Sequence, residues 1–151
     1  MAGHSVKHAT LVFERICSAP VERVFAAFAN PAERANWGTP SETAAFVYDE
    51  MDFREGGVDI FRCGDKKNPQ YRGVTRYYDI VPNERIISSE IVETQGRKLL
   101  VTMSTTTFEA EGVGTKVTVT AQLTSLAGDD MLKGAEFGHD ASLDNLVKAM
   151  R

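Results

Sequence analysis

The sequence predicts an α+β domain in which a curved antiparallel sheet of six to seven strands surrounds a long C-terminal helix. Three observations support this. A first strand is followed by two short segments with helical hydrophobic spacing, then by about ninety residues of strand-like pattern, and helical spacing returns from about Gly128 to the end. Turn residues interrupt the strand region at short intervals, and short connections favour antiparallel neighbours.

The N-terminal part should form one strand and two short helices. Alternating residues suit a strand over Ala9–Ile16. Ser18–Pro20 then opens a helix, whose apolar face has the spacing i, i+3, i+4 and i+7 at Val21, Val24, Phe25 and Phe28. Asn30 can cap a second helix over Pro31–Trp37, with Glu33 at the position of a capping-box acid and Gly38 as the stop.

The middle of the chain should form six further strands separated by glycine, proline or asparagine. We place them near Thr43–Phe53, Val58–Cys63, Tyr71–Ile80, Arg85–Glu93, Lys98–Glu109 and Thr115–Leu123. The last segment should be one helix of about 20 residues, roughly 30 Å long. Its apolar stripe contains Leu132, Ala135, His139, Leu143, Leu146 and Met150.

Length and composition fit a soluble globular protein, with residues 1–151 as one domain. The chain has 42% hydrophobic and 25% charged residues, and its net charge of −4 disfavours nucleic acid as a partner. Its two cysteines, Cys17 and Cys63, do not have metal-ligand spacing and suit reduced thiols.

Targeting and cofactor motifs are absent from the sequence. It contains no apolar stretch near the ~20 residues that cross a bilayer, and Met1–His4 does not begin a signal peptide. We therefore expect a cytoplasmic protein without membrane contact. The sequence also lacks a phosphate-binding loop and a metal-ligand cluster, so we expect no cofactor and no metal.

The predicted architecture favours a ligand cavity. A curled sheet around a single helix is concave, and the space that the helix leaves is typically a pocket with a few polar groups. Alternation places Asp59, Phe61 and Cys63 on one face of their strand, and it also places Ser88 and Glu90 together. Polar residues are frequent in the predicted strands. One face of the sheet is therefore either exposed to solvent or lines a pocket that contains water.

The candidate ligand-binding residues combine aromatic, acidic and apolar side chains of the sheet and helices: Trp37, Asp59, Phe61, Tyr71, Tyr77, Glu90, Met103, Ala135 and His139. For catalysis, the best candidates are His139 and Asp59, an imidazole and a carboxylate that could exchange a proton with a ligand. Alternatively, His139 is a core histidine satisfied by a carboxylate or carbonyl. The two acids could instead lie in solvent or pair with Arg62, Arg72 or Arg76.

Five segments, taken in order, carry a family resemblance: the run from Phe13 through Ser18–Phe25 to Trp37-Gly38, then Asp52–Gly57, Asp79–Ile86, Gly114–Lys116 and Ser142–Leu146. They resemble the START-like, helix-grip proteins of the SRPBCC superfamily, which include the birch-pollen allergen. The most similar branch is related to the C-terminal domain of the heat-shock chaperone ATPase activator. The resemblance implies a helix-grip fold with a cavity under the last helix. Many relatives carry tryptophan where His139 stands.

Three functions follow as expectations. The first is binding of a small apolar or amphipathic molecule between the sheet and the C-terminal helix. The second, implied by the resemblance, is an acid–base enzyme of the polyketide cyclase, dehydratase or hydrolase kind that uses the same cavity. The third is a chaperone-associated interaction module, which the related branch suggests. The sequence does not decide between a monomer and a homodimer.

Overall fold

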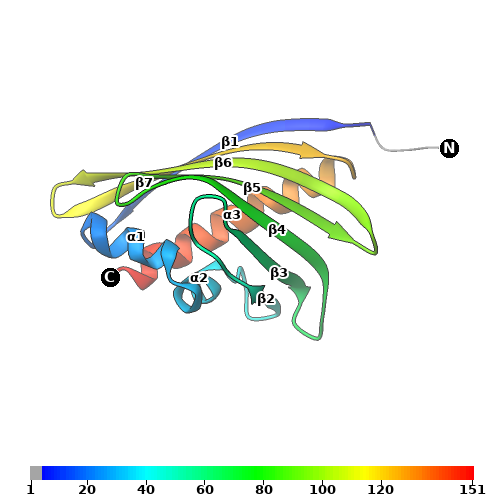
Figure 1. Ribbon diagram of the computed structural model, residues 1–151, viewed down its shortest axis with the longest axis horizontal. Coiled ribbons are helices and arrows are strands. Elements are labelled where there is room, and N and C mark those ends of the chain that lie inside the picture. The colour runs from blue at the N-terminus through cyan, green and yellow to red at the C-terminus, as the bar shows by residue number, and fades with distance from the viewer. Residues whose placement is uncertain (1–4) are drawn as a thin grey trace.

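A single antiparallel sheet organises the chain, and the computed structural model describes residues 5–151 of it. The segment Met1–His4, which the leader prediction concerns, lies outside the described residues. The elements follow in the order β1 (Lys7–Cys17), α1 (Val21–Ala29), α2 (Pro31–Gly38), β2 (Ala44–Glu50), β3 (Val58–Asp65), β4 (Asn68–Val81), β5 (Arg85–Thr94), β6 (Arg97–Glu111), β7 (Gly114–Ser125) and α3 (Asp129–Ala149) (Figure 1).

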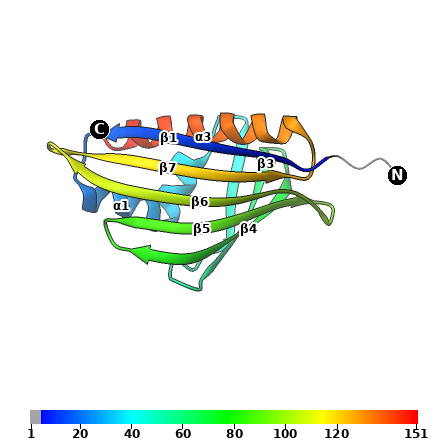
Figure 2. The same cartoon turned by 90° about the horizontal axis from the view of Figure 1, so that it is seen from above.

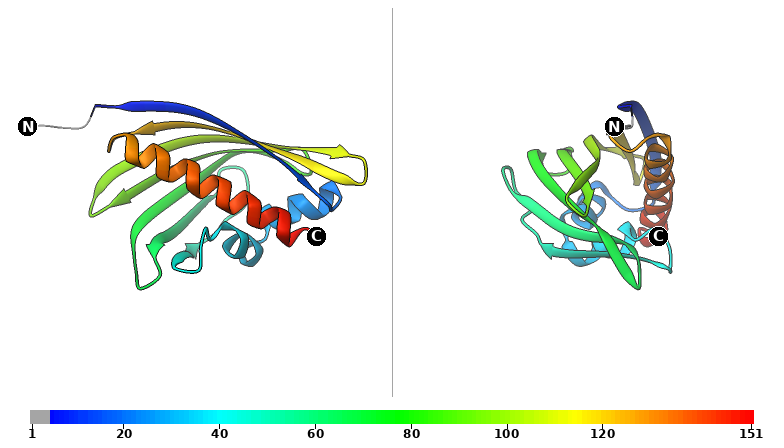
Figure 3. Two further views of the ribbon diagram at one scale, coloured as in Figure 1. Left: turned by 180° about the vertical axis from the view of Figure 1, so that it is seen from behind. Right: turned by 90° about the vertical axis from the view of Figure 1, so that its right-hand side faces the viewer.

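The seven strands have the order β1-β7-β6-β5-β4-β3-β2, with antiparallel pairing throughout. Viewed from above, α3 runs along the sheet on the side of β1 and β7 (Figure 2). The sheet curls from β1 to β2 and holds the helices on its concave side (Figure 3). The predicted fold class, a curved antiparallel sheet with a long C-terminal helix, is confirmed.

Helix α3 is fixed to one side of this concave surface. It packs against β1, β7 and α2. Arg15 of β1 donates hydrogen bonds to Asp140 at 2.9 Å and to Asp144 at 3.0 Å. Between these two acids in the sequence, Ser142 Oγ donates to the carbonyl of Gly38, the last residue of α2, at 2.9 Å. These contacts hold the helix toward β1, so strands β4 and β5 lie farther from it.

The apolar core consists of two clusters rather than one. The larger lies around α1, α2 and the C-terminal half of α3, and its members include Phe25, Phe28, Phe108, Leu143 and Leu146. The smaller joins the other ends of the central strands to the N-terminal half of α3, through Val92, Leu100, Ala121 and Leu123 with Met131, Leu132 and Ala135. On strands β4, β5 and β6 the middle of the concave side therefore belongs to neither cluster, whereas Leu11 of β1 packs against both.

Local signals account for the short helices. The side chain of Asn30 caps α2, because its Oδ1 accepts the Glu33 backbone N–H at 3.1 Å. The expected return bond of a capping box does not form, since the Glu33 carboxylate accepts from Arg23 at 2.5 Å instead. Pro20 directly precedes α1. Within residues 5–151, none of the helices is both long and apolar enough to cross a membrane.

One strand boundary was predicted wrongly. The strand expected over Thr43–Phe53 ends at Glu50. A tight turn follows it, in which Arg54 N–H donates to the carbonyl of Asp52 at 3.0 Å and Gly57 N–H donates to the carbonyl of Arg54 at 2.8 Å. Residues engaged in such a turn cannot continue the ladder with β3.

Gly73 in β4 permits the close packing of Phe61, and this generates a prediction. A Cβ added at Gly73 would lie 1.9 Å from Cζ of Phe61. We expect Gly73→Ala to lower the free energy of unfolding by about 1–3 kcal/mol through overpacking, measured by urea denaturation. Adding Phe61→Leu should recover part of the loss.

The control is Gly134→Ala in α3, where an added Cβ has nothing within 4 Å. Because alanine favours a helix over glycine, this variant should gain up to about 1 kcal/mol. Equal stability of Gly73→Ala and wild type would contradict the close contact.

Candidate functional site

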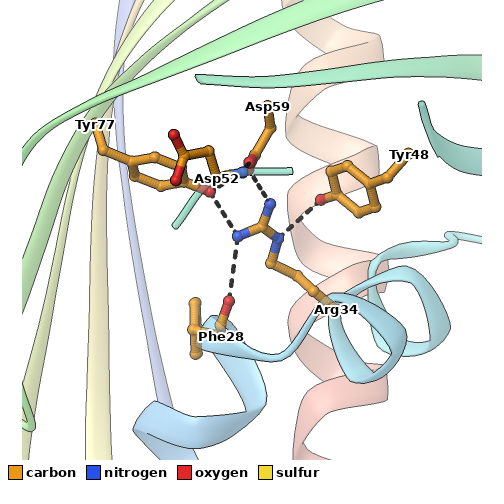
Figure 4. A network of polar contacts seen from close by, with 6 residues as sticks. All are labelled: Phe28, Arg34, Tyr48, Asp52, Asp59 and Tyr77. Carbon is orange, nitrogen blue, oxygen red and sulfur yellow. Dashed lines mark hydrogen bonds and ion pairs between the residues drawn. The ribbon is translucent and has the colours of Figure 1, made fainter. Parts of the chain in front are cut away.

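An arginine from α2 organises a buried polar network on the concave side. Arg34 donates hydrogen bonds to the hydroxyl of Tyr48 at 2.8 Å, to the hydroxyl of Tyr77 at 2.6 Å and to the carbonyl of Phe28 at 3.1 Å. It also forms an ion pair with Asp59. The guanidinium thus joins α1, α2, β2, β3 and β4 (Figure 4).

Asp59 is fully satisfied within this network. Its side chain is 0% exposed, and that of Arg34 is 12% exposed. The carboxylate accepts hydrogen bonds from Arg34, from the hydroxyl of Tyr77 and from the backbone N–H of Asp52 at 2.9 Å. A buried charge with a paired partner and additional donors is stable in its ionised form.

Burial and Arg34 act against each other on the pKa values of this network. Burial raises the pKa of Tyr48 to about 12, although Arg34 pulls it down. Burial also raises the pKa of Tyr77. Burial disfavours the charge of Arg34, but Tyr48, Tyr77 and Asp59 outweigh it and raise the arginine's pKa. At neutral pH both phenols therefore keep their protons and the arginine stays charged.

The position of Asp59 makes it a structural carboxylate and a poor general base. Its partner is Arg34, not one of the cross-strand arginines considered from the sequence. Among those, Arg62 pairs with Asp49 and Arg72 pairs with Glu93, both at the surface. The candidate base from the sequence is thus committed to holding α2 on the sheet.

A row of small polar residues crosses the middle of the concave side. Thr102, Glu90 and Thr75 are direct neighbours on β6, β5 and β4, and Ser104 is paired with Ser88 in the adjacent row. We call these five residues the polar belt. It lies between the two apolar clusters, and four of its members keep partly exposed surface while Thr102 is buried. The belt is thus accessible from the concave side.

Glu90 is the charged member of the polar belt. Within the described chain its carboxylate makes no side-chain hydrogen bond, and every side-chain N or O atom of that chain that is closed off from solvent has a partner. The oxygens of Glu90 are therefore accessible. Burial nevertheless raises its pKa, against the opposing charges of His139 and Arg34. A carboxylate that is surrounded by protein but keeps its oxygens accessible is typical of a concave binding site.

His139 lies on α3 between the parts of the helix that meet the two apolar clusters. Its ring stacks on Phe13 of β1, with 5.3 Å between the ring centroids and 7° between the planes. Nδ1 is 2.8 Å from the carbonyl oxygen of Ala135. Since a carbonyl can only accept, Nδ1 carries the proton in this bond, and Nε2 is the nitrogen free to meet a ligand.

The remaining predicted site residues fall in different places. Tyr77 belongs to the Arg34 network. Phe61 is 1% exposed and stacks on Phe46 with centroids 4.6 Å apart. Tyr71 and Ala135 are half-buried against the smaller apolar cluster, on the concave side.

Two further predicted ligand-binding residues, Met103 and Trp37, lie on the convex face and in the larger apolar cluster, respectively. Met103 is 40% exposed and follows the inward-facing Thr102, so strand alternation places it on the convex face. Its predicted place in the cavity is wrong. Trp37 is buried in the larger cluster, where Nε1 donates to the carbonyl of Ala27 at 3.0 Å and the ring packs on Phe28. This tryptophan seals the contact between α1 and α2.

The thiol of Cys63 is also on the concave side, one position from the aromatic pair of Phe46 and Phe61. Burial and the charge of Glu90 raise its pKa to about 11. The thiol stays protonated at neutral pH, which does not suit a nucleophile.

Among the described residues, two open hollows lie away from the polar belt. One, of about 830 Å³, is open and is lined by α2, the loop after it and the end of α3. The other, of about 380 Å³, lies on the convex face around His8, Met103 and Gln122. Neither hollow is lined by Glu90, Asp59 or His139.

Sequence reasoning missed Arg34 and Tyr48. A signal for Arg34 was available, because it precedes Trp37 by three residues and so lies on the same side of a helix as that buried ring. The spacing alone does not identify Asp59 as its partner, since the partner depends on how α2 crosses the sheet.

The Arg34–Asp59 pair generates a stability prediction. We expect Arg34→Met and Asp59→Asn each to lower the free energy of unfolding by about 3–5 kcal/mol, because each leaves a buried charge without its partner. The double variant should lose clearly less than the sum, as measured by a double-mutant cycle in urea. Arg62→Met, which opens the exposed pair with Asp49, is the control and should have a far smaller effect. Strict additivity of the two buried changes would contradict the pairing.

The raised pKa of Glu90 predicts that removing this carboxylate increases the free energy of unfolding, by an amount that depends on pH. A carboxyl whose pKa is higher in the folded protein stabilises the fold below its ordinary value of 4.5 and loses that contribution as pH rises through the folded value. Glu90→Gln should therefore unfold at higher urea than wild type at neutral pH, and the difference should shrink as the pH is lowered toward 4.5.

Glu93→Gln on the same strand is the matched control, because the Glu93 carboxylate pairs with Arg72 on the convex face. That variant should gain no stability at neutral pH. A Glu90→Gln protein less stable than wild type at neutral pH would show that the carboxylate has a partner in the fold.

Solved structures similar to this chain share its whole fold. A protein from Rhizobium loti is 32% identical, with 96% of this chain and 99% of that chain covered and a TM-score of 0.83. A protein from Rhizobium leguminosarum is 33% identical, with coverage of 94% and 96% and a TM-score of 0.77. One from Chromobacterium violaceum is 26% identical, with coverage of 94% and 97% and a TM-score of 0.76.

The family assignment comes from the sequence match. Among curated proteins, none matches the chain. Residues 18–151, from the end of β1 through α3, match the family described as Activator of Hsp90 ATPase homolog 1-like protein. This agrees with the resemblance to the chaperone-activator branch of the SRPBCC superfamily. With nearly its whole length matched, the chain belongs to the Activator of Hsp90 ATPase homolog 1-like protein family.

Proposed function

We propose that the chain binds a small, partly apolar molecule on the concave side of the sheet, at the polar belt and opposite α3. The observation that carries this proposal is the Glu90 carboxylate. It faces inward, makes no hydrogen bond to the described chain and is surrounded by protein strongly enough to raise its pKa. Folded proteins seldom keep such a group without a use for it.

The surroundings of the belt support an amphipathic guest. Apolar side chains of the two clusters lie on either side, so a molecule at the belt would contact both apolar and polar surface. Helix α3 contacts β1 and β7 rather than β4 and β5. The belt residues on those two strands, Thr75, Ser88 and Glu90, accordingly keep accessible surface.

The setting agrees with an intracellular carrier or receptor for such a molecule. Cys17 and Cys63 are both free thiols, as a reducing compartment would keep them. The family name refers to Hsp90 ATPase activation, and a chaperone-associated role is the alternative that this name suggests. The concave side is the feature that the present proposal rests on.

A second candidate function is acid–base catalysis on the bound molecule. It is favoured by one observation, that the charge of His139 acts on Glu90 across the concave side. In this version Glu90 takes the place that sequence reasoning gave to Asp59. His139→Ala would then abolish turnover of a substrate while preserving its binding.

Filling the belt tests the proposed function. Nile red, a neutral dye that fluoresces in apolar surroundings, is a suitable general probe. We expect wild type to bind it and Ser104→Phe to weaken binding by about tenfold or more, because the new ring would occupy the space beside Ser88. Fluorescence titration measures both.

The control is Met103→Phe, which changes the adjacent residue on the convex face of the same strand. It should leave the affinity unchanged. Weak binding by wild type, or equal losses in both variants, would overturn the proposal of a concave binding site.

A further inference from the structure

Resting on the proposed function, we propose that the ligand carries a protonated amine, which pairs with Glu90 while an apolar body lies against the flanking clusters. The ligand class is thus a small amphipathic amine. The charged groups on the concave side differ in whether the protein itself supplies a partner.

Charge compensation leaves Glu90 as the group that needs a cation. Arg34 and Asp59 neutralise each other within their network. Arg15 is taken by Asp140 and Asp144 at the junction of β1 and α3. Glu90 has neither an ion pair nor a hydrogen bond within the described chain. A cation placed there would compensate the carboxylate for the interactions with water that it loses on burial.

The neighbours of Glu90 offer acceptors for a ligand that donates hydrogen bonds. The Nδ1 proton of His139 points to the carbonyl of Ala135, so Nε2 is the ring nitrogen left to face a ligand. The flanking hydroxyls of Thr75 and Thr102 can also accept. An ammonium group has three N–H donors and no acceptor. It can therefore donate to one carboxylate, one imidazole nitrogen and one hydroxyl at the same time.

The other groups near Glu90 suit the apolar part of such a ligand. Cys63 and Tyr48 both keep their protons at neutral pH, so neither adds a competing charge. Phe46, Phe61 and Tyr48 form a contiguous aromatic cluster, with centroid separations of 4.6–6.0 Å. Aromatic faces attract both apolar groups and cations. Arg34 is the nearby positive charge; its guanidinium lies over the Tyr48 ring, 4.8 Å from the ring centroid, and is paired with Asp59.

A matched pair of probes tests the amine. 2-Phenylethylamine and 2-phenylethanol have the same apolar body and differ in the polar group. By isothermal titration calorimetry at neutral pH, wild type should bind the amine at least about tenfold more tightly than the alcohol. Glu90→Gln should remove that preference. Glu93→Gln, which changes the convex face of the same strand, should keep it.

The outcomes separate the inference from the proposed function. Equal affinities of wild type for the two probes would contradict the proposal of an amine ligand. A preference for the amine that survives in Glu90→Gln would also contradict it. Binding of Nile red without binding of either phenyl compound would also overturn it and would leave the concave site standing. Absence of Nile red binding in wild type would remove the proposed function and the inference together.

Discussion

An unpaired carboxylate in the middle of a curved sheet is the constraint on which the functional interpretation depends. Placing Glu90 on the concave side removes water from it without supplying a protein partner, and its raised pKa reflects the free energy that this placement requires. An apolar residue at this position would be more stable in a purely structural sheet. The threonines and serines around Glu90 are also less favourable for stability than apolar residues would be, since they lie between the two apolar clusters of the core.

Asp59 shows how the same fold treats a carboxylate that is only structural. It lies in the same row of the sheet as Glu90, with Thr75 between them, and it is more completely buried. Arg34, Tyr77 and the backbone of Asp52 satisfy it, so the pair fastens α2 to the strand edge of β3. The two acids, two strands apart, thus have opposite environments. Asp59 belongs to a structural ion pair, whereas Glu90 has the environment of a binding-site carboxylate.

Much of the fold could be predicted from the sequence because the periodicity changes are long and the turns are marked by glycine, proline and asparagine. The cap at Asn30 and the shared face of Asp59, Phe61 and Cys63 on β3 followed from local rules. Met103 did not, because β6 has threonine or serine on both faces near it and alternation alone does not say which face is concave. Sequence reasoning preferred Asp59 to Glu90 as the catalytic acid, because only the tertiary arrangement shows that Arg34 pairs with Asp59 and not with Glu90.

The most direct test of an occupied concave side is a crystal structure of the protein purified from its own host without added ligand. The interpretation predicts electron density for a small organic molecule between α3 and the sheet, in contact with Glu90 and His139. Side chains closed over that space, with the Glu90 carboxylate hydrogen-bonded to the protein itself, would contradict it.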